Sequence, residues 1–364
     1  MAGKLTLGLL FGGRSGEHEV SVKSARSVYE ALDRNKFNPI LIGISKEGDW
    51  YLIEEPEAVF SAGVVGPQSG LPVTIIAQPG GQPFVALDGA AVPHLDVVFP
   101  VLHGTFGEDG TIQGLLELAN IPYVGAGVMA SAVGMDKVMM KTVFRQADLP
   151  VVDDVCVTRQ LFLNNTEEAL DMIEEHLSYP CFIKPANMGS SVGVNRADDR
   201  KGLEVALDEA ARFDAKIIVE QGIEAREVEC SVLGNETVKC SIPGEVIPAG
   251  EFYDYEAKYK SAESKLLIPA PLTEMQLKAI QEMAARVFQA IDCSGLGRVD
   301  FFVTKDTGEI YVNEINTMPG FTTISMYPKL WAASGLAYEE LINQLVKLAF
   351  ERHSERNKNE TTYN

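Results

Sequence analysis

The sequence predicts an α/β protein of three consecutive units, and three patterns carry this prediction. Residues 4–44 contain a buried strand, a helix and a second buried strand, which together form a βαβ unit. A loop rich in glycine and serine follows a β-prone run at residues 180–194, and residues 297–316 have the composition of a β-hairpin. The chain of 364 residues is 46% hydrophobic, so two or three domains with a large core are expected.

The first unit is expected to span residues 1–125 as a parallel-sheet α/β domain. Strands are predicted at residues 4–11 and 37–44, with a helix at 19–32 between them. Residues 60–93 are rich in Gly and Pro and predict a loop-and-hairpin insertion, after which residues 95–101 form another buried strand.

The second unit is expected at residues 126–220 and the third at 221–364. In the second, the pattern predicts helices at 135–146 and 201–212 and strands at 180–183 and 216–220. In the third, it predicts a strand at 227–233, a polar aromatic segment at 250–265, a helix at 273–291, the hairpin, and a last helix at 338–352 followed by frayed polar residues.

The hairpin carries the strongest chemical signal in the chain. Residues 305–308 are turn formers, and strands that pair about them place four polar side chains on one face, with Asp300 opposite Glu314 and Arg298 opposite Asn316. The same pairing makes Phe302 and Val312 their neighbours. Carboxylates among apolar residues need a counter-charge, and two carboxylates with an amide oxygen suit magnesium beside nucleotide phosphates. The alternative is a solvated face with an ordinary cross-strand salt bridge.

The glycine loop at residues 12–16, GGRSG, is a candidate for anion binding. It lies between a strand and a helix, where backbone amides can receive an anion. It is not a dinucleotide fingerprint, because the second glycine of that pattern is absent, and the chain contains no GxxxxGK[ST] P-loop. A plain turn is the alternative.

A second loop is more informative. After Lys184, the small residues at 187–194 can form a flap whose backbone amides close over phosphates, or an ordinary surface turn. Lys137 and Lys184 can contact phosphates as point charges. The backbone beside Glu220 can form hydrogen bonds with adenine, and Glu227 can bind ribose hydroxyls. The alternative for each of these residues, taken singly, is an ordinary solvated surface residue.

Composition limits the partners of the protein. The formal net charge of −20 argues against nucleic acid and an anionic membrane surface, since both demand a basic footprint. The five cysteines are scattered without a CxxC pair, so free core thiols in a reducing compartment are expected. The N-terminal apolar run at residues 5–11 is too short for a signal-peptide core and leads into a glycine loop, and no apolar stretch approaches the ~20 residues of a membrane span, so a cytoplasmic protein is expected.

Eight ordered blocks resemble the ATP-grasp superfamily and, within it, the D-alanine-D-alanine ligase family. They are FGGRSGEHEVS (11–21), LHGTFGEDGTIQG (102–114), GVMASAVGMDK (127–137), IKPANMGSSVGV (183–194), VEQGIEAREVECSVLG (219–234), FYDYEAKY (252–259), GRVDFF (297–302) and NEINTMPGFTTISMYPKL (313–330). The resemblance implies a three-domain ATP-grasp architecture and the ATP-dependent condensation of two D-alanines through an acyl phosphate, for peptidoglycan synthesis. It also implies two magnesium ions, which manganese can replace, and a homodimer. Two rivals remain: another ATP-grasp carboxylate–amine ligase, such as a D-alanine-D-lactate ligase, and a non-catalytic nucleotide-binding regulator.

The resemblance also implies roles for individual residues. Those that would hold the substrates are Glu17 and His103 for the first D-alanine, and Lys258 and Ser325 for the carboxylate of the second. Those that would serve the reaction are Arg298 and the amide of Gly320 at the oxyanion, with Tyr259 of a lid joining Glu17 and Ser190. The metal ligands would be Asp300, Glu314 and Asn316, and the ATP positions are Lys137, Lys184, Ser191, Glu220, Gln221, Ile223 and Glu227.

Two positions bear on how closely the chain follows the family. Gln221 stands where many relatives carry lysine, which puts a side-chain contact with adenine in doubt and leaves a backbone contact available. Tyr259 favours D-alanine over D-lactate as the acceptor, because depsipeptide-forming relatives typically have histidine there. The alternative is that Tyr253, Tyr255 and Tyr259 only alternate along an exposed strand.

Overall fold

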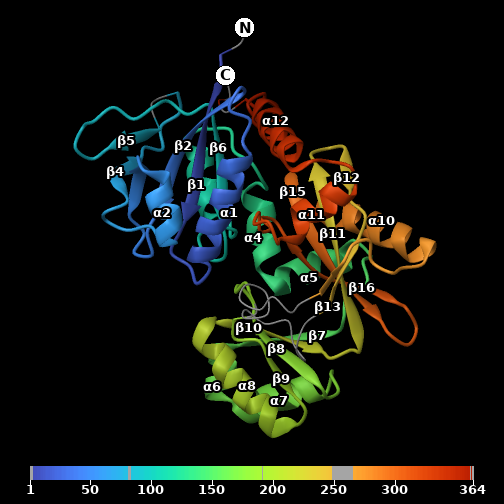
Figure 1. Ribbon diagram of the computed structural model, residues 1–364. Coiled ribbons are helices and arrows are strands. Elements are labelled where there is room, and N and C mark those ends of the chain that lie inside the picture. The colour runs from blue at the N-terminus through green and yellow to red at the C-terminus, as the bar shows by residue number, and fades with distance from the viewer. Residues whose placement is uncertain (1–2, 81–82, 191, 248–264, 361, 363–364) are drawn as a thin grey trace.

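The protein folds into three α/β units that meet around a common centre (Figure 1). The computed structural model describes residues 3–80, 83–190, 192–247, 265–360 and 362. In Figure 1 the N-terminal sheet lies at the upper left, the C-terminal sheet at the right, and the central sheet with its helices at the bottom.

The N-terminal unit contains a mixed sheet in the order β5-β4-β3-β2-β1-β6. The strands β1 (Leu5–Gly12), β2 (Phe37–Ile44) and β6 (Val97–Leu102) are parallel, as the βαβ pattern predicted, and α1 (His18–Ala31) connects the first two. The remaining strands are antiparallel: β3 (Trp50–Ile53), β4 (Gly70–Ile75) and β5 (Phe84–Ala86). The expected hairpin within residues 60–93 is therefore confirmed, whereas β3 and the helices α2 (Pro56–Ala62) and α3 (Thr111–Leu118) were not predicted.

The central unit contains the antiparallel sheet β7-β10-β8-β9. Its strands are β7 (Asp154–Thr158), β8 (Cys181–Pro185), β9 (Asn195–Ala197) and β10 (Lys216–Gln221). One buried core joins this sheet to α6 (Arg159–Asn164), α7 (Thr166–Glu174) and α8 (Arg200–Phe213). The predicted strands and the helix at 201–212 are confirmed, and β7, α6 and α7 were missed.

The C-terminal unit contains the sheet β14-β13-β11-β15-β16, with β12 paired to β11. Its strands are β11 (Ala225–Gly234), β12 (Val238–Cys240), β13 (Gly244–Ile247), β14 (Lys265–Leu267), β15 (Gly295–Thr304) and β16 (Ile310–Asn316). Helix α10 (Glu274–Ala290) covers it and begins with a capping box formed by Thr273 and Gln276, which satisfies exposed amides of its first turn. Most of the predicted polar aromatic segment at 250–265 lies outside the described residues.

Two helices that precede the central sheet pack on the C-terminal sheet instead. The helices are α4 (Val128–Met135) and α5 (Lys137–Gln146), and their buried side chains, such as Ala130, Met140 and Phe144, share one core with Val299 of β15. Helix α5 therefore connects the two units. The unit boundaries near residues 125 and 220 stay predictions.

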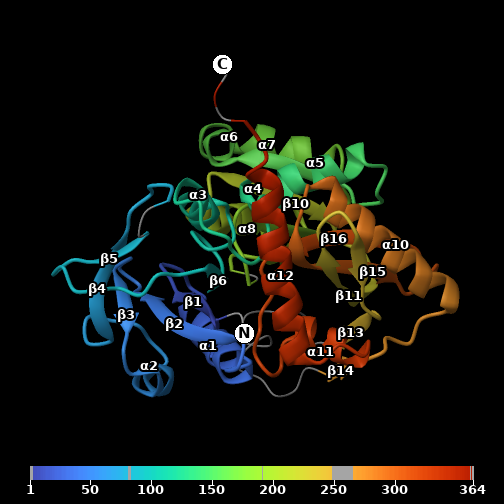
Figure 2. The same cartoon turned by 90° about the horizontal axis from the view of Figure 1, so that it is seen from above.

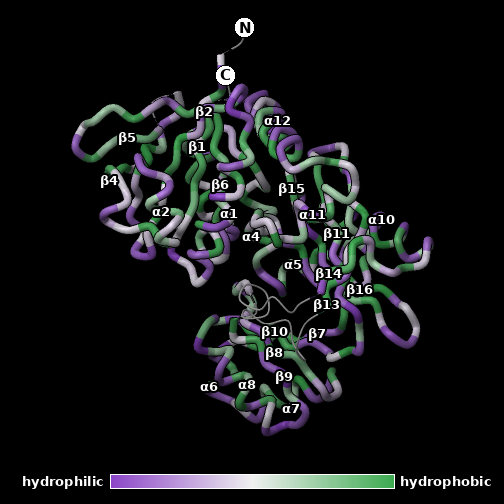
Figure 3. The backbone as a smooth tube through the Cα atoms, in the orientation of Figure 1, coloured by the Kyte–Doolittle hydropathy of each residue, from purple (hydrophilic) through white to green (hydrophobic). Residues whose placement is uncertain are grey.

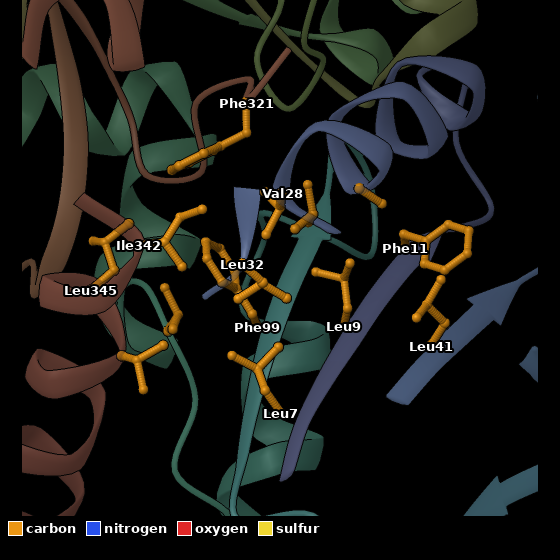
Figure 4. Close-up of a cluster of buried hydrophobic side chains, with 14 of the residues drawn as sticks. Leu7, Leu9, Phe11, Val28, Leu32, Leu41, Phe99, Phe321, Ile342 and Leu345 are labelled. Carbon is orange, nitrogen blue, oxygen red and sulfur yellow. The ribbon is translucent and has the colours of Figure 1, made fainter. Parts of the chain in front are cut away.

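The last helices return the chain to the N-terminal unit. These are α11 (Met326–Ala333) and α12 (Tyr338–Arg356), and α12 lies across the molecule in the view from above (Figure 2). Leu345 of α12 packs with Leu9 of β1, Val28 of α1 and Phe321 in one buried cluster (Figure 4). Because α12 continues to Arg356, the fraying expected from about residue 353 is wrong.

Hydropathy follows this burial. Hydrophobic stretches include β1, β2 and β6, and many outer loops carry hydrophilic stretches (Figure 3). The five cysteines are free thiols, as expected, but Cys156 is exposed and so is not a core residue. Among the helices that the structure describes, none combines the length and the apolar composition that a bilayer crossing requires.

Candidate active site

The β15–β16 hairpin pairs as predicted at its functional end. Arg298 lies opposite Asn316 and Asp300 opposite Glu314. Directly beyond Asp300 a β-bulge shifts the register, so that Phe301, not Phe302, lies opposite Val312. The expected neighbour Val312 is therefore wrong, whereas Phe302 keeps the alternation that places it on the face of Arg298 and Asp300. The bulge turns Val312 into the core, where it is fully buried, while the polar side chains keep their face.

A nearly buried guanidinium organises this face. Arg298 donates two bonds to Asp300, from Nε to Oδ1 at 2.7 Å and from Nη2 to Oδ2 at 2.6 Å. Its Nε also lies 3.0 Å from Oε2 of Glu229 on β11, a carboxylate that the sequence reasoning missed. Burial opposes the charge of Arg298, but Asp300, Glu229 and Glu314 outweigh it and raise the pKa of the guanidinium well above its ordinary value. The hairpin is thus an electrostatically coupled site and not a solvated face.

The three expected metal ligands fit a magnesium–nucleotide site by their donor chemistry. Asn316 uses Oδ1 to accept a bond from the Met318 amide at 2.9 Å, and this oxygen has a second lone pair. Asp300 faces Arg298, and Glu314 Oε2 lies 3.7 Å from Nζ of Lys137. Over the described ranges, no group of three His, Cys, Asp or Glu side chains forms a ready metal cage. Magnesium commonly binds one or two carboxylates and completes its shell with phosphates and water, so this donor set suits it.

Lys184 and Glu220 form the second charged centre. Nζ of Lys184 lies 2.5 Å from Oε2 of Glu220, and Nζ of Lys141 on α5 contacts the other oxygen, Oε1. Burial acts to raise the pKa of Glu220, but the two lysines outweigh it and hold the pKa far below its ordinary value. Lys141 is fully buried and was not singled out in the sequence, although it lies one helical turn after Lys137.

The loop after β8 connects Lys137, an expected nucleotide residue, to the N-terminal unit. Nζ of Lys137 donates to the carbonyl of Met188 at 2.9 Å. Ser190, at a positive φ of 51°, donates its hydroxyl to Oε1 of Glu17, which is far away in the sequence. A Cβ added at Gly189 would lie 2.8 Å from the other oxygen of Glu17, so the absence of a side chain at Gly189 lets the loop lie close to this carboxylate.

His103 joins the same centre from the end of β6. Its Nδ1 lies 3.2 Å from the carbonyl oxygen of Met318 and 3.7 Å from Oε1 of Glu108. Burial opposes protonation of His103, but Glu108 and Glu17 outweigh it and raise the pKa of the imidazole. Glu108 is a further buried carboxylate that the sequence reasoning missed; its Oε2 accepts the amide of Gly104 at 2.9 Å.

The loop that follows β16 lies beside His103. The amide of Phe321 donates to Oγ of Ser24 at 3.3 Å, and the same hydroxyl lies 3.2 Å from Nε2 of His103. A Cβ added at Gly320 would lie 2.8 Å from Oγ of Ser325, so these two residues are neighbours. The glycine loop at residues 12–14 lines a mostly apolar cavity of about 490 Å³ that also reaches His103.

The contacts therefore connect residues of all three units in one continuous series that returns to the hairpin; we call this series the circuit. It runs from Glu314 to Lys137, along the 188–190 loop to Glu17, and back from His103 through Met318 to Asn316. Ser15 completes it, because its hydroxyl accepts the amide of Glu17 at 3.1 Å and donates to the carbonyl of His103 at 2.7 Å. The circuit brings together residues that the sequence analysis assigned to substrate, phosphate and metal.

Of the residues expected at adenine, at the ribose and in the lid, the structure describes Gln221, Ile223 and Glu227. The side chain of Gln221 accepts the amide of Ser178 at 2.8 Å and donates to its carbonyl at 3.0 Å, so it is turned toward that loop. Ile223, between β10 and β11, and Glu227, on β11, are both half-buried. The structure does not describe Ser191, Lys258 and Tyr259, and their roles stay predictions.

Three α/β units that meet at an acidic hairpin and a lysine-bearing loop define an ATP-grasp architecture. The family model described as D-ala D-ala ligase N-terminus matches residues 6–126, and the one described as D-ala D-ala ligase C-terminus matches residues 143–347. The chain belongs to the D-ala D-ala ligase family.

Full-length relatives agree with this assignment. The chain is 51% identical to a D-alanine--D-alanine ligase of Heliobacterium modesticaldum, with 98% of each chain covered. It is 49% identical to that of Natranaerobius thermophilus, with 99% of each covered. Among solved structures, the D-alanine-D-alanine ligase of Coxiella burnetii superposes with a TM-score of 0.84 at 40% identity, covering 98% of this chain and 97% of that one. The VanG D-Ala:D-Ser ligase of Enterococcus faecalis gives a TM-score of 0.86 at 37% identity, covering 95% and 99%.

Proposed function

We propose that this protein condenses two D-alanines to D-alanyl-D-alanine at the expense of ATP, as a peptidoglycan precursor ligase. The observation that carries this proposal is the contact between Glu17 and Ser190. It sets the carboxylate of the N-terminal loop against the phosphate-binding loop, within the circuit that also contains the acidic hairpin. An amino acid ammonium bound by Glu17 therefore lies on the same site as the nucleotide phosphates. Family membership with about 50% identity over the full chain supports the same reaction.

The proposed chemistry needs no protein nucleophile. The carboxylate of the first D-alanine attacks the γ-phosphorus of ATP and forms an acyl phosphate, with ADP as the leaving group. The amine of the second D-alanine then attacks the acyl carbon, and phosphate leaves as the amide bond forms. Such reactions are accelerated mainly by positioning and by neutralising charge.

The residues of the circuit suit these demands. Glu17, with His103 beside it, would hold the ammonium of the first D-alanine. The contacts of Arg298 with Asp300 and Glu229 use Nε and Nη2, and a guanidinium has five N–H donors, so further donors can reach the tetrahedral oxyanion. The Gly320 amide would be the second oxyanion donor. Ser325 would contact the carboxylate of the second D-alanine, together with Lys258.

The ATP and metal assignments are part of this proposal. Lys137 and Lys184 would bind phosphate oxygens, Ser191 would close over them, and the segment from Glu220 through Gln221 to Ile223 would hold adenine, with Glu227 on the ribose. Asp300, Glu314 and Asn316 would hold two magnesium ions, with manganese as a substitute. When bound there, these ions neutralise the charge of the ATP phosphates. We extend the proposal to a cytoplasmic homodimer on the ground of family membership alone.

A substrate panel tests the function. Purified protein is incubated with magnesium, ATP and D-alanine, alone or with D-serine, D-lactate or L-alanine, and both ADP and the ligated products are measured. We expect ADP and D-alanyl-D-alanine with D-alanine alone. Preferential D-alanyl-D-serine or D-alanyl-D-lactate would assign the chain to another acceptor class, and nucleotide binding without ADP release would favour the regulator.

A pair of hairpin variants tests the metal role. Glu314→Gln removes a charge from the proposed site and should abolish ADP release in a folded protein, because the phosphate charge is no longer neutralised. Glu309→Gln is the matched control, since Glu309 lies on the same hairpin beside the turn and contacts Tyr311 at 3.3 Å. Near-normal ADP formation by a folded Glu314→Gln protein excludes the metal role.

A further inference from the structure

A buried lysine that has no role in the proposed reaction faces the nucleotide residues. Lys141 of α5 has a fully buried side chain, and its ammonium contacts Glu220, whose side chain is 4% exposed. The other oxygen of Glu220 lies 2.5 Å from Lys184. The three side chains thus form a buried Lys–Glu–Lys chain with one surplus positive charge.

That surplus matters because Lys184 is surrounded by carboxylates. Glu220, Glu314 and Glu227 all act on its ammonium. If Glu220 had Lys184 as its single counterion, the two charges would cancel, and an incoming phosphate would have to compete with a carboxylate for the ammonium. A second cation on Glu220 removes this competition, so Lys184 keeps attraction for an anionic ligand.

Simple tethering of α5 to the central sheet does not account for burying a lysine. Two other ion pairs already join α5 to that sheet, Asp136 with Lys216 at 2.5 Å and Arg145 with Asp154. Lys216 and Arg145 are 33% and 44% exposed, so their cations keep more of their hydration than the fully buried ammonium of Lys141. A fully buried ion pair is weak evidence for stability, because desolvation offsets the Coulombic gain.

We infer that Lys141 is a positioning residue for nucleotide binding: as second counterion of Glu220, it leaves the positive charge of Lys184 available to an ATP phosphate. The inference rests on the proposed function, because it takes Lys184 to be a phosphate ligand. It specifies which part of the nucleotide should be affected. Phosphate binding depends on Lys141, and adenosine binding does not.

Calorimetric titration of the full chain tests this, with magnesium and the non-hydrolysable analogue AMP-PNP in one series and adenosine in the other. Lys141→Met keeps the length of the side chain and removes the charge. We expect its Kd for AMP-PNP to rise about ten-fold or more and its Kd for adenosine to stay within about two-fold. Adding Glu220→Gln to Lys141→Met should restore AMP-PNP binding to within about three-fold of the wild type, because the Glu220 carboxylate then no longer competes with phosphate for Lys184.

Arg145→Met is the matched control, since it removes another cation that links α5 to the central sheet. It should leave both affinities unchanged. Three results overturn the inference. Lys141→Met binds AMP-PNP and adenosine equally more weakly, Lys141→Met binds AMP-PNP as tightly as the wild type, or the double variant does not recover AMP-PNP binding. If Lys141→Met alone does not fold, the double variant Lys141→Met/Glu220→Gln is compared with the Glu220→Gln single variant. The Kd of the double variant for AMP-PNP must lie within about three-fold of that of the single variant, and a larger loss of affinity overturns the inference. A wild type that neither binds AMP-PNP nor releases ADP instead refutes the proposed function.

Discussion

Replacing Arg298 by lysine tests how the hairpin serves the reaction. The substitution keeps the positive charge beside Asp300 and Glu229 and removes the planar fork of donors. Arg298 is held by two bonds of 2.7 and 2.6 Å to Asp300 and a contact of 3.0 Å to Glu229, with only 16% of its side chain exposed. An ammonium cannot reproduce that two-bond geometry, nor can it hold a further donor toward an oxyanion at the same time.

The expected magnitude differs for stability and for catalysis. Losing one hydrogen bond to a charged partner costs about 1.5–3 kcal/mol of folding stability. Losing one oxyanion donor lowers kcat by about 100- to 1,000-fold. Arg298→Lys should therefore fold with a lowered Tm and lose nearly all turnover.

Arg226→Lys is the matched control for this prediction. Arg226 forms the same kind of fork with Glu245, at 2.8 and 2.7 Å, on a neighbouring strand outside the circuit. Both variants are assayed by coupled detection of ADP at saturating ATP and D-alanine, and their thermal unfolding is followed by circular dichroism. A folded Arg298→Lys protein whose kcat stays within about three-fold of the wild type would refute the oxyanion role.

Three further predictions concern other parts of the site. Glu17→Gln should raise the KM for the first D-alanine by about ten-fold or more in initial-rate kinetics, since the ammonium loses its charged partner; an unchanged KM contradicts the role. Burial favours the protonated form of Glu220, but Lys141 and Lys184 outweigh burial and keep the pKa of this carboxyl below the ordinary 4.5. The ionised carboxylate therefore stabilises the fold above pH 4.5, and this stabilisation is lost as the pH falls below that value. Urea unfolding should find Glu220→Gln destabilised at about pH 7, with a gap to the wild type that narrows at about pH 3.5, and a constant gap counts against the assignment. Tyr259→His should gain D-alanyl-D-lactate synthesis in mixed D-alanine and D-lactate, most clearly at lower pH, because histidine can be charged near neutrality; an unchanged product ratio removes Tyr259 as the specificity residue.

Local periodicity predicted the parts of the fold where one element repeats a clear pattern. Strands β1 and β2 with α1, and helix α10, were found at nearly the predicted positions because their apolar spacing runs over many residues. Strand β3, helix α2 and strand β7 were missed because they are short, and a few residues do not define a period. The register of the hairpin was correct up to Asp300 and failed at the bulge, since one extra residue leaves no mark in composition.

In the site, too, contacts within one hairpin were predictable from the sequence, whereas contacts between distant segments were not. Asp300 and Glu314 were placed opposite each other from the alternation of two adjacent strands. Local patterns could not reveal that Glu229 is buried against Arg298, Glu108 beside His103 and Lys141 against Glu220, because these partners come from distant strands and helices. Burial changes how a charged residue acts, and it is a property of the assembled fold.

The most direct test of the account is a balance of products from ATP and D-alanine alone. Wild-type protein with magnesium should form D-alanyl-D-alanine and release ADP and phosphate in equal amounts, with no product when L-alanine replaces D-alanine. ADP release without dipeptide, or dipeptide formation without ADP, would contradict the claim that the circuit around Glu17, Lys137 and the acidic hairpin is a D-alanine-D-alanine ligase site.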